Sequence, residues 1–69
     1  MVEVFKTNVQ KVSQANKLVT LLLDHFPDSK INFDLQDCDK ILRIDGSNFR
    51  AEKVTLLINE SGFVCNVLE

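Results

Sequence analysis

The groups in this sequence that could bind a soft metal ion or act as nucleophiles are few and far apart. They are two cysteines, Cys38 and Cys65, and one histidine, His25. Thiolate and imidazole are ligands that Cu(I) and Zn²⁺ prefer, so a two-thiol site is one hypothesis. The alternative is that Cys65 is a small core residue and Cys38 an incidental exposed thiol. We expect His25 to be solvated or to interact with a helix C-terminus.

Carboxylates and hydroxyls suggest no catalytic or hard-metal site. Ca²⁺ needs six to eight oxygen ligands, and the predicted turn at residues 37–39 supplies too few. No hydroxyl has an evident orienting His. With only Gly46 and Gly62 there is no glycine-rich phosphate loop. The sequence therefore predicts a protein that is not an enzyme and has no cofactor. The acidic residues considered around this turn are Asp34, Asp37, Asp39 and Asp45.

Size and charge narrow the classes of partner. The 69 residues predict one domain, residues 1–69, and eight Lys and Arg against ten Asp and Glu give a net charge of −2. These charges are scattered, which disfavours nucleic-acid binding. No apolar run approaches the roughly 18–20 residues of a membrane span, and the N-terminus lacks the features of a signal peptide. We therefore expect no membrane partner, a cytoplasmic protein and reduced cysteines.

Hydrophobic periodicity predicts six elements in the order strand, helix, strand, strand, helix, strand. The sequence Thr7-Asn8-Val9-Gln10 has the form of a capping box that would begin the first helix. Ser47 or Asn48 would cap the second helix, and Gly62 would end it in a left-handed conformation. The predicted strands are residues 2–6, 31–36, 40–45 and 63–68. The first helix is expected to begin near residues 7–10, to run for about four turns and to end before Pro27. The second is expected between its cap at Ser47 or Asn48 and Gly62.

This order predicts the α+β ferredoxin-like fold, a βαββαβ sandwich with two helices on one face of a four-stranded antiparallel sheet. The strands would lie in the order 4-1-3-2. The loop at residues 7–12, the turn at residues 37–39 and the end of the second helix would then share one end of the molecule.

Alternation along the strands predicts which side chains face the helices. The opposite face would then carry an apolar patch next to the polar strand at residues 31–36, which suggests a protein contact surface. The side chains expected toward the helices are Val2, Val4, Ile31, Phe33, Leu35, Leu42, Ile44, Cys65 and Val67. The expected contact surface comprises Phe5, Ile41, Val64 and Leu68.

The chain also resembles the heavy-metal-associated domain, the fold of small copper chaperones. Four segments in order carry the resemblance: Phe26-Pro27, residues 30–35, residues 41–46 and residues 58–63. That family binds soft cations through an M-x-C-x-x-C loop between the first strand and first helix. Here the two thiol positions fall on Val9 and Val12, or on Val12 and Ala15, so both cysteines are missing.

The sequence therefore predicts a module with a lost metal site that acts through a protein partner or as a homodimer. One alternative is a Cu(I)- or Zn²⁺-binding protein that uses Cys38, Cys65 or ligands from another chain. A small-molecule regulatory module of the same topology is a third possibility.

Overall fold

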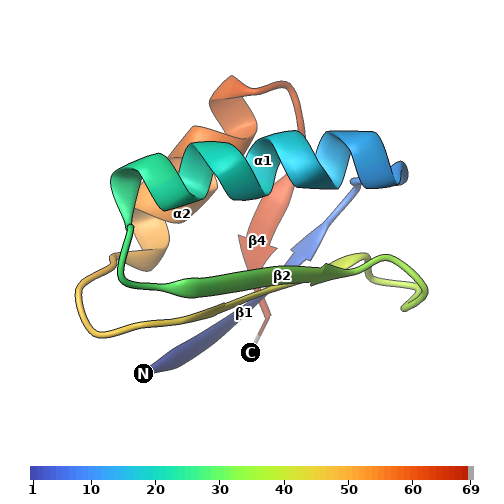
Figure 1. Cartoon of the computed structure of the whole chain (residues 1–69). Coiled ribbons are helices and arrows are strands. Elements are labelled where there is room, and N and C mark those ends of the chain that lie inside the picture. The colour runs from blue at the N-terminus through green and yellow to red at the C-terminus, as the bar shows by residue number, and fades with distance from the viewer. Residues whose placement is uncertain (69) are drawn as a thin grey trace.

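A computed structural model of the chain describes residues 1–68. Its four strands form a single sheet in the order β2-β3-β1-β4, and every neighbouring pair is antiparallel (Figure 1). The predicted ferredoxin-like βαββαβ fold is thereby confirmed. The elements are β1 (Val2–Thr7), α1 (Val12–His25), β2 (Lys30–Asp34), β3 (Ile41–Asp45), α2 (Ala51–Glu60) and β4 (Cys65–Val67).

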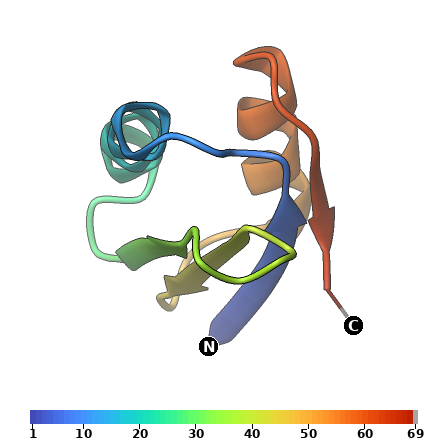
Figure 2. The same cartoon turned by 90° about the vertical axis from the view of Figure 1, so that its right-hand side faces the viewer.

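Both helices cover the same face of the sheet and leave the other face open. Figure 2 shows α1 end-on above the β2 side of the sheet, with α2 above the β1 and β4 side. The helices contact each other as well as the strands beneath them. The sheet therefore has one face that packs against the helices and a second face, here called the open face, that has no covering layer.

The hydrophobic core lies between the sheet and the helices. Its largest fully buried side chains come from both layers, so neither layer could bury its apolar side alone. The completely buried side chains are Phe5, Val9, Leu22, Leu42, Ile44, Val54 and Ile58. Ala15 and Leu18 of α1 and Cys65 of β4 complete the same cluster.

The predicted orientation of β1 was wrong by one residue. Phe5 is completely buried and Thr7 is nearly so, whereas Val2 is exposed. Phe5 lies opposite Leu42 on β3, and directly opposed residues share a face. Both faces of this short strand carry apolar residues, so alternation alone could not set its phase. Phe5 is selected for the core because its side chain has the largest apolar area on the strand.

The first helix begins later than the predicted capping box. Thr7 ends β1, and α1 starts at Val12. The Thr7 hydroxyl donates to the Lys40 carbonyl and accepts from the backbone N–H of Val9 at 3.2 Å. A tertiary contact with the hairpin therefore takes the hydroxyl that the sequence pattern assigned to a helix cap.

The capping contact that does form at α1 comes from within its first turn. The Gln14 side-chain oxygen accepts from the backbone N–H of Lys11 at 3.2 Å. The second helix likewise begins after both predicted caps, at Ala51, and its N-cap residue Arg50 makes no side-chain capping hydrogen bond. Phe49 is buried against the core. That burial places the chain between β3 and α2, and the helix begins two residues later.

The end of α2 follows the prediction. Gly62 has φ of 95°, the left-handed region that glycine adopts without a Cβ penalty. The N–H of Phe63 donates to the Ile58 carbonyl at 3.2 Å and the N–H of Gly62 donates to the Asn59 carbonyl at 3.0 Å. This pair of hydrogen bonds is a Schellman motif, which satisfies carbonyls left free at the helix end. The chain is thereby turned back toward β4.

Candidate functional site

The loop between β1 and α1, residues 8–11, is a structural element rather than a ligand-bearing one. Val9 is completely buried in the core, while Val12 is 68% exposed at the start of α1. Asn8 accepts a hydrogen bond from the backbone N–H of Val64 at 2.8 Å through its side-chain oxygen. Both alignments with the heavy-metal-associated domain therefore place aliphatic residues at its thiol positions: Val9 in this loop and Val12 at the start of α1, or Val12 and the buried Ala15 within α1.

Three segments that are far apart in the sequence meet at this end, as predicted. The backbone N–H of Thr7 donates to the Asp39 carbonyl at 3.0 Å, which joins the loop to the hairpin turn. The hydrogen bond between Asn8 and Val64 joins it to the segment before β4. The geometry places Cys38 and Cys65 at the same end of the molecule, on either side of β1.

Cys65 is buried in the core, which limits access to its thiol. It lies opposite Thr7 on the helix-facing side of the sheet and is only 3% exposed. Burial raises the pKa of the Cys65 thiol to about 11, so the thiol stays protonated at neutral pH. Nucleophilic attack requires the thiolate. Cys65 is thus a small core residue, and both cysteines are free.

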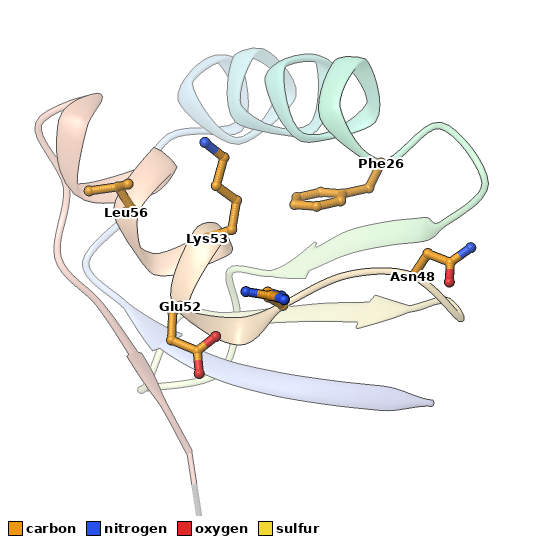
Figure 3. A pocket seen from close by; sticks show the side chains of 6 residues that line it. Phe26, Asn48, Glu52, Lys53 and Leu56 are labelled. Carbon is orange, nitrogen blue, oxygen red and sulfur yellow. The ribbon is translucent and has the colours of Figure 1, made fainter.

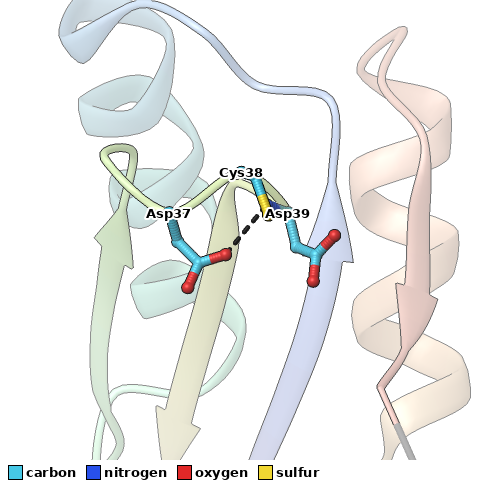
Figure 4. A group of neighbouring side chains, drawn as sticks. All are labelled: Asp37, Cys38 and Asp39. Atoms are coloured by element: carbon cyan, nitrogen blue, oxygen red, sulfur yellow. Dashed lines mark hydrogen bonds between the residues drawn. The ribbon is translucent and has the colours of Figure 1, made fainter.

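Cys38 lies in an exposed turn between two aspartates. The ligand atoms of Asp37, Cys38 and Asp39 all fall within 4.8 Å of one another (Figure 4). The Asp37 carboxylate accepts from the backbone N–H of Asp39 at 2.9 Å, and Asp39 pairs with Lys6 at 3.6 Å. These contacts explain the proximity of the two carboxylates by turn formation alone.

Lys40 completes the turn. It has φ of 48°, and its backbone N–H donates to the Asp37 carbonyl at 3.0 Å. Its ammonium group donates to the Leu35 carbonyl at 2.9 Å. The turn at residues 35–40 is therefore held by internal hydrogen bonds. Cys38 presents an exposed thiol from a preformed loop.

His25 is the last residue of α1 and is exposed. Its ring centroid lies 6.3 Å from that of Phe26, and α1 places it at the end of the helix remote from the loop at residues 8–11. The structure thus separates His25 from both cysteines, and the three soft-ligand residues do not form a common site within residues 1–68.

The predicted contact surface needs one replacement. Phe5 faces the core, and Val4 takes its place on the open face, opposite Arg43. The N–H of Leu68 donates to the Val4 carbonyl at 2.9 Å, so these two residues lie side by side. Val4, Ile41 and Leu68 line a shallow hollow together with Arg43 and Asp34. We call Val4, Ile41 and Leu68 the open-face cluster.

Val64 remains exposed but lies outside the regular part of the sheet. It precedes β4, and 53% of its surface is accessible. Sequence reasoning missed Val4 because it placed the neighbouring Phe5 on this face. Lys6, two residues after Val4 and on the same face, was the available signal, since a charged residue favours the solvent side.

A second hollow lies beside α2. Phe26 forms one wall, and Arg50, Lys53 and Leu56 come from the start of α2 and its N-cap. Figure 3 shows Lys53 extending toward α1, while Glu52 points in the opposite direction. The polar side chains that line this hollow are all exposed to solvent. Among the described residues no buried polar side chain lacks a hydrogen-bond partner, so nothing in this hollow calls for a ligand.

Comparisons with profiles of known protein families, with curated proteins and with solved structures found no significant match to this chain. The fold nevertheless defines the class: a ferredoxin-like α+β protein with one uncovered sheet face. Neither helix described here has the length and apolar character needed to cross a bilayer.

Proposed function

We propose that this protein is a non-enzymatic protein-binding module, related in design to the heavy-metal-associated domain but without its metal loop. The open-face cluster supports the proposal most directly. Three apolar side chains, Val4, Ile41 and Leu68, sit together in a hollow on a sheet face that no other layer covers. The same hollow is also lined by Arg43, by Asn32 and by the three acidic residues Asp34, Asp37 and Asp39. Protein interfaces commonly combine apolar side chains with polar and charged ones.

The first loop supports the loss of the metal site. Val9, which one alignment places at a thiol position, is buried in the core, and residues 8–11 offer neither thiol nor carboxylate. The exposed thiol of Cys38, free and without a disulfide partner, fits a reducing compartment. We therefore also propose a cytoplasmic location.

A matched pair of leucines tests the contact surface. Leu68 on the open face is 43% exposed and Leu56 on α2 is 50% exposed. The tagged wild type and the Leu56→Lys variant should retain the same protein partner, while Leu68→Lys and Ile41→Lys should lose it. Affinity capture with quantitative mass spectrometry is the measurement. Equal retention by all four proteins, or loss only with Leu56→Lys, would reject the open face as the contact surface.

Metal binding through non-standard ligands is the alternative. The exposure of Cys38 and the burial of Cys65 favour Cys38 as the donor, alone or with ligands from another chain. One thiolate and two carboxylates suit Zn²⁺ better than Cu(I). We expect calorimetric titration of the reduced protein with Zn²⁺ or Cu(I) to show no stoichiometric binding. A tight one-to-one complex that is abolished by Cys38→Ser would favour the metal-binding function over our proposal.

A further inference from the structure

Hydrogen-bond alternation identifies which backbone groups of the edge strand β2 are free. The N–H of Gly46 donates to the Met1 carbonyl at 2.9 Å, across the β1–β3 pair. The N–H of Leu68 donates to the Val4 carbonyl, across the β1–β4 pair. Because the bonding direction alternates along an antiparallel strand, β1 directs its odd-numbered residues to β3 and its even-numbered residues to β4.

The same alternation extends across β3 to the edge. Leu42 and Ile44 bond toward β1, so Ile41, Arg43 and Asp45 bond toward β2. Their opposite residues on β2 are Asp34, Asn32 and Lys30. The N–H and C=O groups of Ile31 and Phe33 therefore point away from the sheet, at an edge with no further strand.

We propose that β2 pairs with β2 of a second copy of this chain, antiparallel, with Asn32 on the two-fold axis. In this register Ile31 lies opposite the partner's Phe33, and all their free backbone groups are used in hydrogen bonds. The two four-stranded sheets become one continuous sheet. The proposal goes beyond the binding function of the open face, because it concerns the β2 edge and leaves that face uncovered. The edge and the open-face hollow share Asn32, Phe33 and Asp34, whereas Lys30 belongs to the edge alone.

The charges of β2 are complementary to those of a second β2 when Asn32 lies on the two-fold axis, which favours this register and a second copy as the partner. Lys30 falls opposite the partner's Asp34, and the symmetry produces the pair twice. These are non-hydrogen-bonded positions, where opposed Cα atoms are only about 4.5 Å apart and side chains approach closely. Both side chains are exposed, and neither forms an ion pair within residues 1–68. A register shifted by two residues would lose both pairs.

The neighbouring groove is also suited to a second copy. It runs between α1 and β2, and its apolar lining includes Val12, Val19, Ile31, Phe33 and Leu35. Val12 is largely exposed, and the β2 residues are only half-buried. The two-fold axis at Asn32 would bring the groove of each copy against the same groove of the other, where these side chains would be covered.

The other edge of the sheet is a poorer candidate. Strand β4 has three residues, Cys65–Val67, against five in β2, and it contains no charged side chain. Short edge strands are one of the ways in which proteins prevent edge-to-edge pairing. Strand β2 has no proline. A lysine on an edge strand commonly prevents pairing with another chain, but in the proposed register Lys30 is neutralised by the partner's Asp34. The dimer therefore forms through β2.

Charge reversal provides the test. Sedimentation velocity from micromolar to millimolar protein should show a monomer–dimer equilibrium for the wild type. Lys30→Glu and Asp34→Lys each create two like-charged pairs and should raise the dimer dissociation constant about tenfold or more. An equimolar mixture of the two variants should dimerise again, as should the double variant. Lys53→Glu and Glu60→Lys on α2 are the controls and should behave as the wild type.

Three outcomes would overturn the proposal. One is a wild type that stays monomeric at millimolar concentration. Another is a dimer that persists in the Lys30→Glu and Asp34→Lys variants. The same holds if both variants are monomeric and an equimolar mixture of them does not dimerise. Leu68→Lys should leave the β2 dimer intact, so failure of this proposal and failure of open-face binding are separate results.

Amide exchange checks the backbone pairing directly. The amides of Ile31 and Phe33 should exchange rapidly at low concentration and slow down as the dimer forms. The amide of Asn32 should be protected at both concentrations, because it bonds to β3. Protection of Ile31 and Phe33 that does not change with concentration, in a protein that dimerises, would contradict pairing through β2.

Discussion

The two faces of the sheet are built by the same strands, yet they have different roles. On β1, Phe5 and Thr7 face the helices, while Val4 and Lys6 face outward. The inner side chains share a continuous core with the helices, whereas the outer ones have neighbours only on the adjacent strands. Substitutions on the inner face should therefore act through stability, and those on the open face through association.

Substitution of Phe5 and of Val4 should give the largest difference in the free energy of unfolding between the two faces. Phe5→Ala removes a fully buried aromatic side chain and should lower the free energy of unfolding by about 3–5 kcal/mol. Val4→Ala should cost less than about 1 kcal/mol, since Val4 is only partly buried. Urea denaturation followed by circular dichroism measures both. Similar costs for the two variants would contradict the observed phase of β1.

Thr7 and Lys6 give a second, smaller difference. Thr7→Val removes the hydroxyl that bonds to Lys40 and Val9, and it leaves a carbonyl and an N–H without that partner. We expect a loss of about 1–3 kcal/mol. Lys6→Ala removes only an exposed ion pair with Asp39 and should cost less than about 1 kcal/mol. The same denaturation experiment decides. A harmless Thr7→Val would show that the hydroxyl does not stabilise the hairpin junction.

The buried Cys65 thiol should make the stability of the protein depend on pH. Burial raises the pKa of the Cys65 thiol to about 11 in the folded protein, whereas an unfolded thiol titrates near about 8.5. Between these values the unfolded chain binds fewer protons than the folded one, so stability falls as pH rises, by at most about 1.4 kcal/mol per pH unit. Below about pH 8.5 both states are protonated and the effect vanishes.

Cys65→Ala should remove this part of the pH dependence, while Cys38→Ala should leave it unchanged. The measurement is the free energy of unfolding of the wild type and the two variants at several pH values between about 8 and 11, where the linkage relation predicts the effect. Alkylation of the native protein at neutral pH should modify Cys38 and spare Cys65. Equal slopes for both variants would show that Cys65 does not carry the effect.

The smallest effect on stability is expected on the open face. Leu68→Ser should change the free energy of unfolding by no more than about 0.5 kcal/mol, because the side chain is well exposed. Its effect should instead appear as lost partner capture. A strongly destabilised Leu68→Ser protein would mean that the open-face cluster supports the fold rather than an interface.

Sequence periodicity predicted the class and order of the elements, the sheet topology and the glycine-terminated end of α2. These features depend on local chemistry: strand alternation, the apolar stripe of α1 and the φ of Gly62. It also predicted that three distant segments meet at one end, since that follows from the topology. The absence of cysteine from residues 7–12 follows directly from the sequence.

Only the tertiary structure decided the phase of β1, the start of α1 and the composition of the open face. Apolar residues occupy both parities of β1, so the choice between Phe5 and Val4 depends on which side chain fills the space under the helices. The Thr7 hydroxyl could serve a helix cap or a distant carbonyl, and the hairpin brought to it by folding determines which. Local sequence lists the possible partners of a group, but packing determines which of them come within reach.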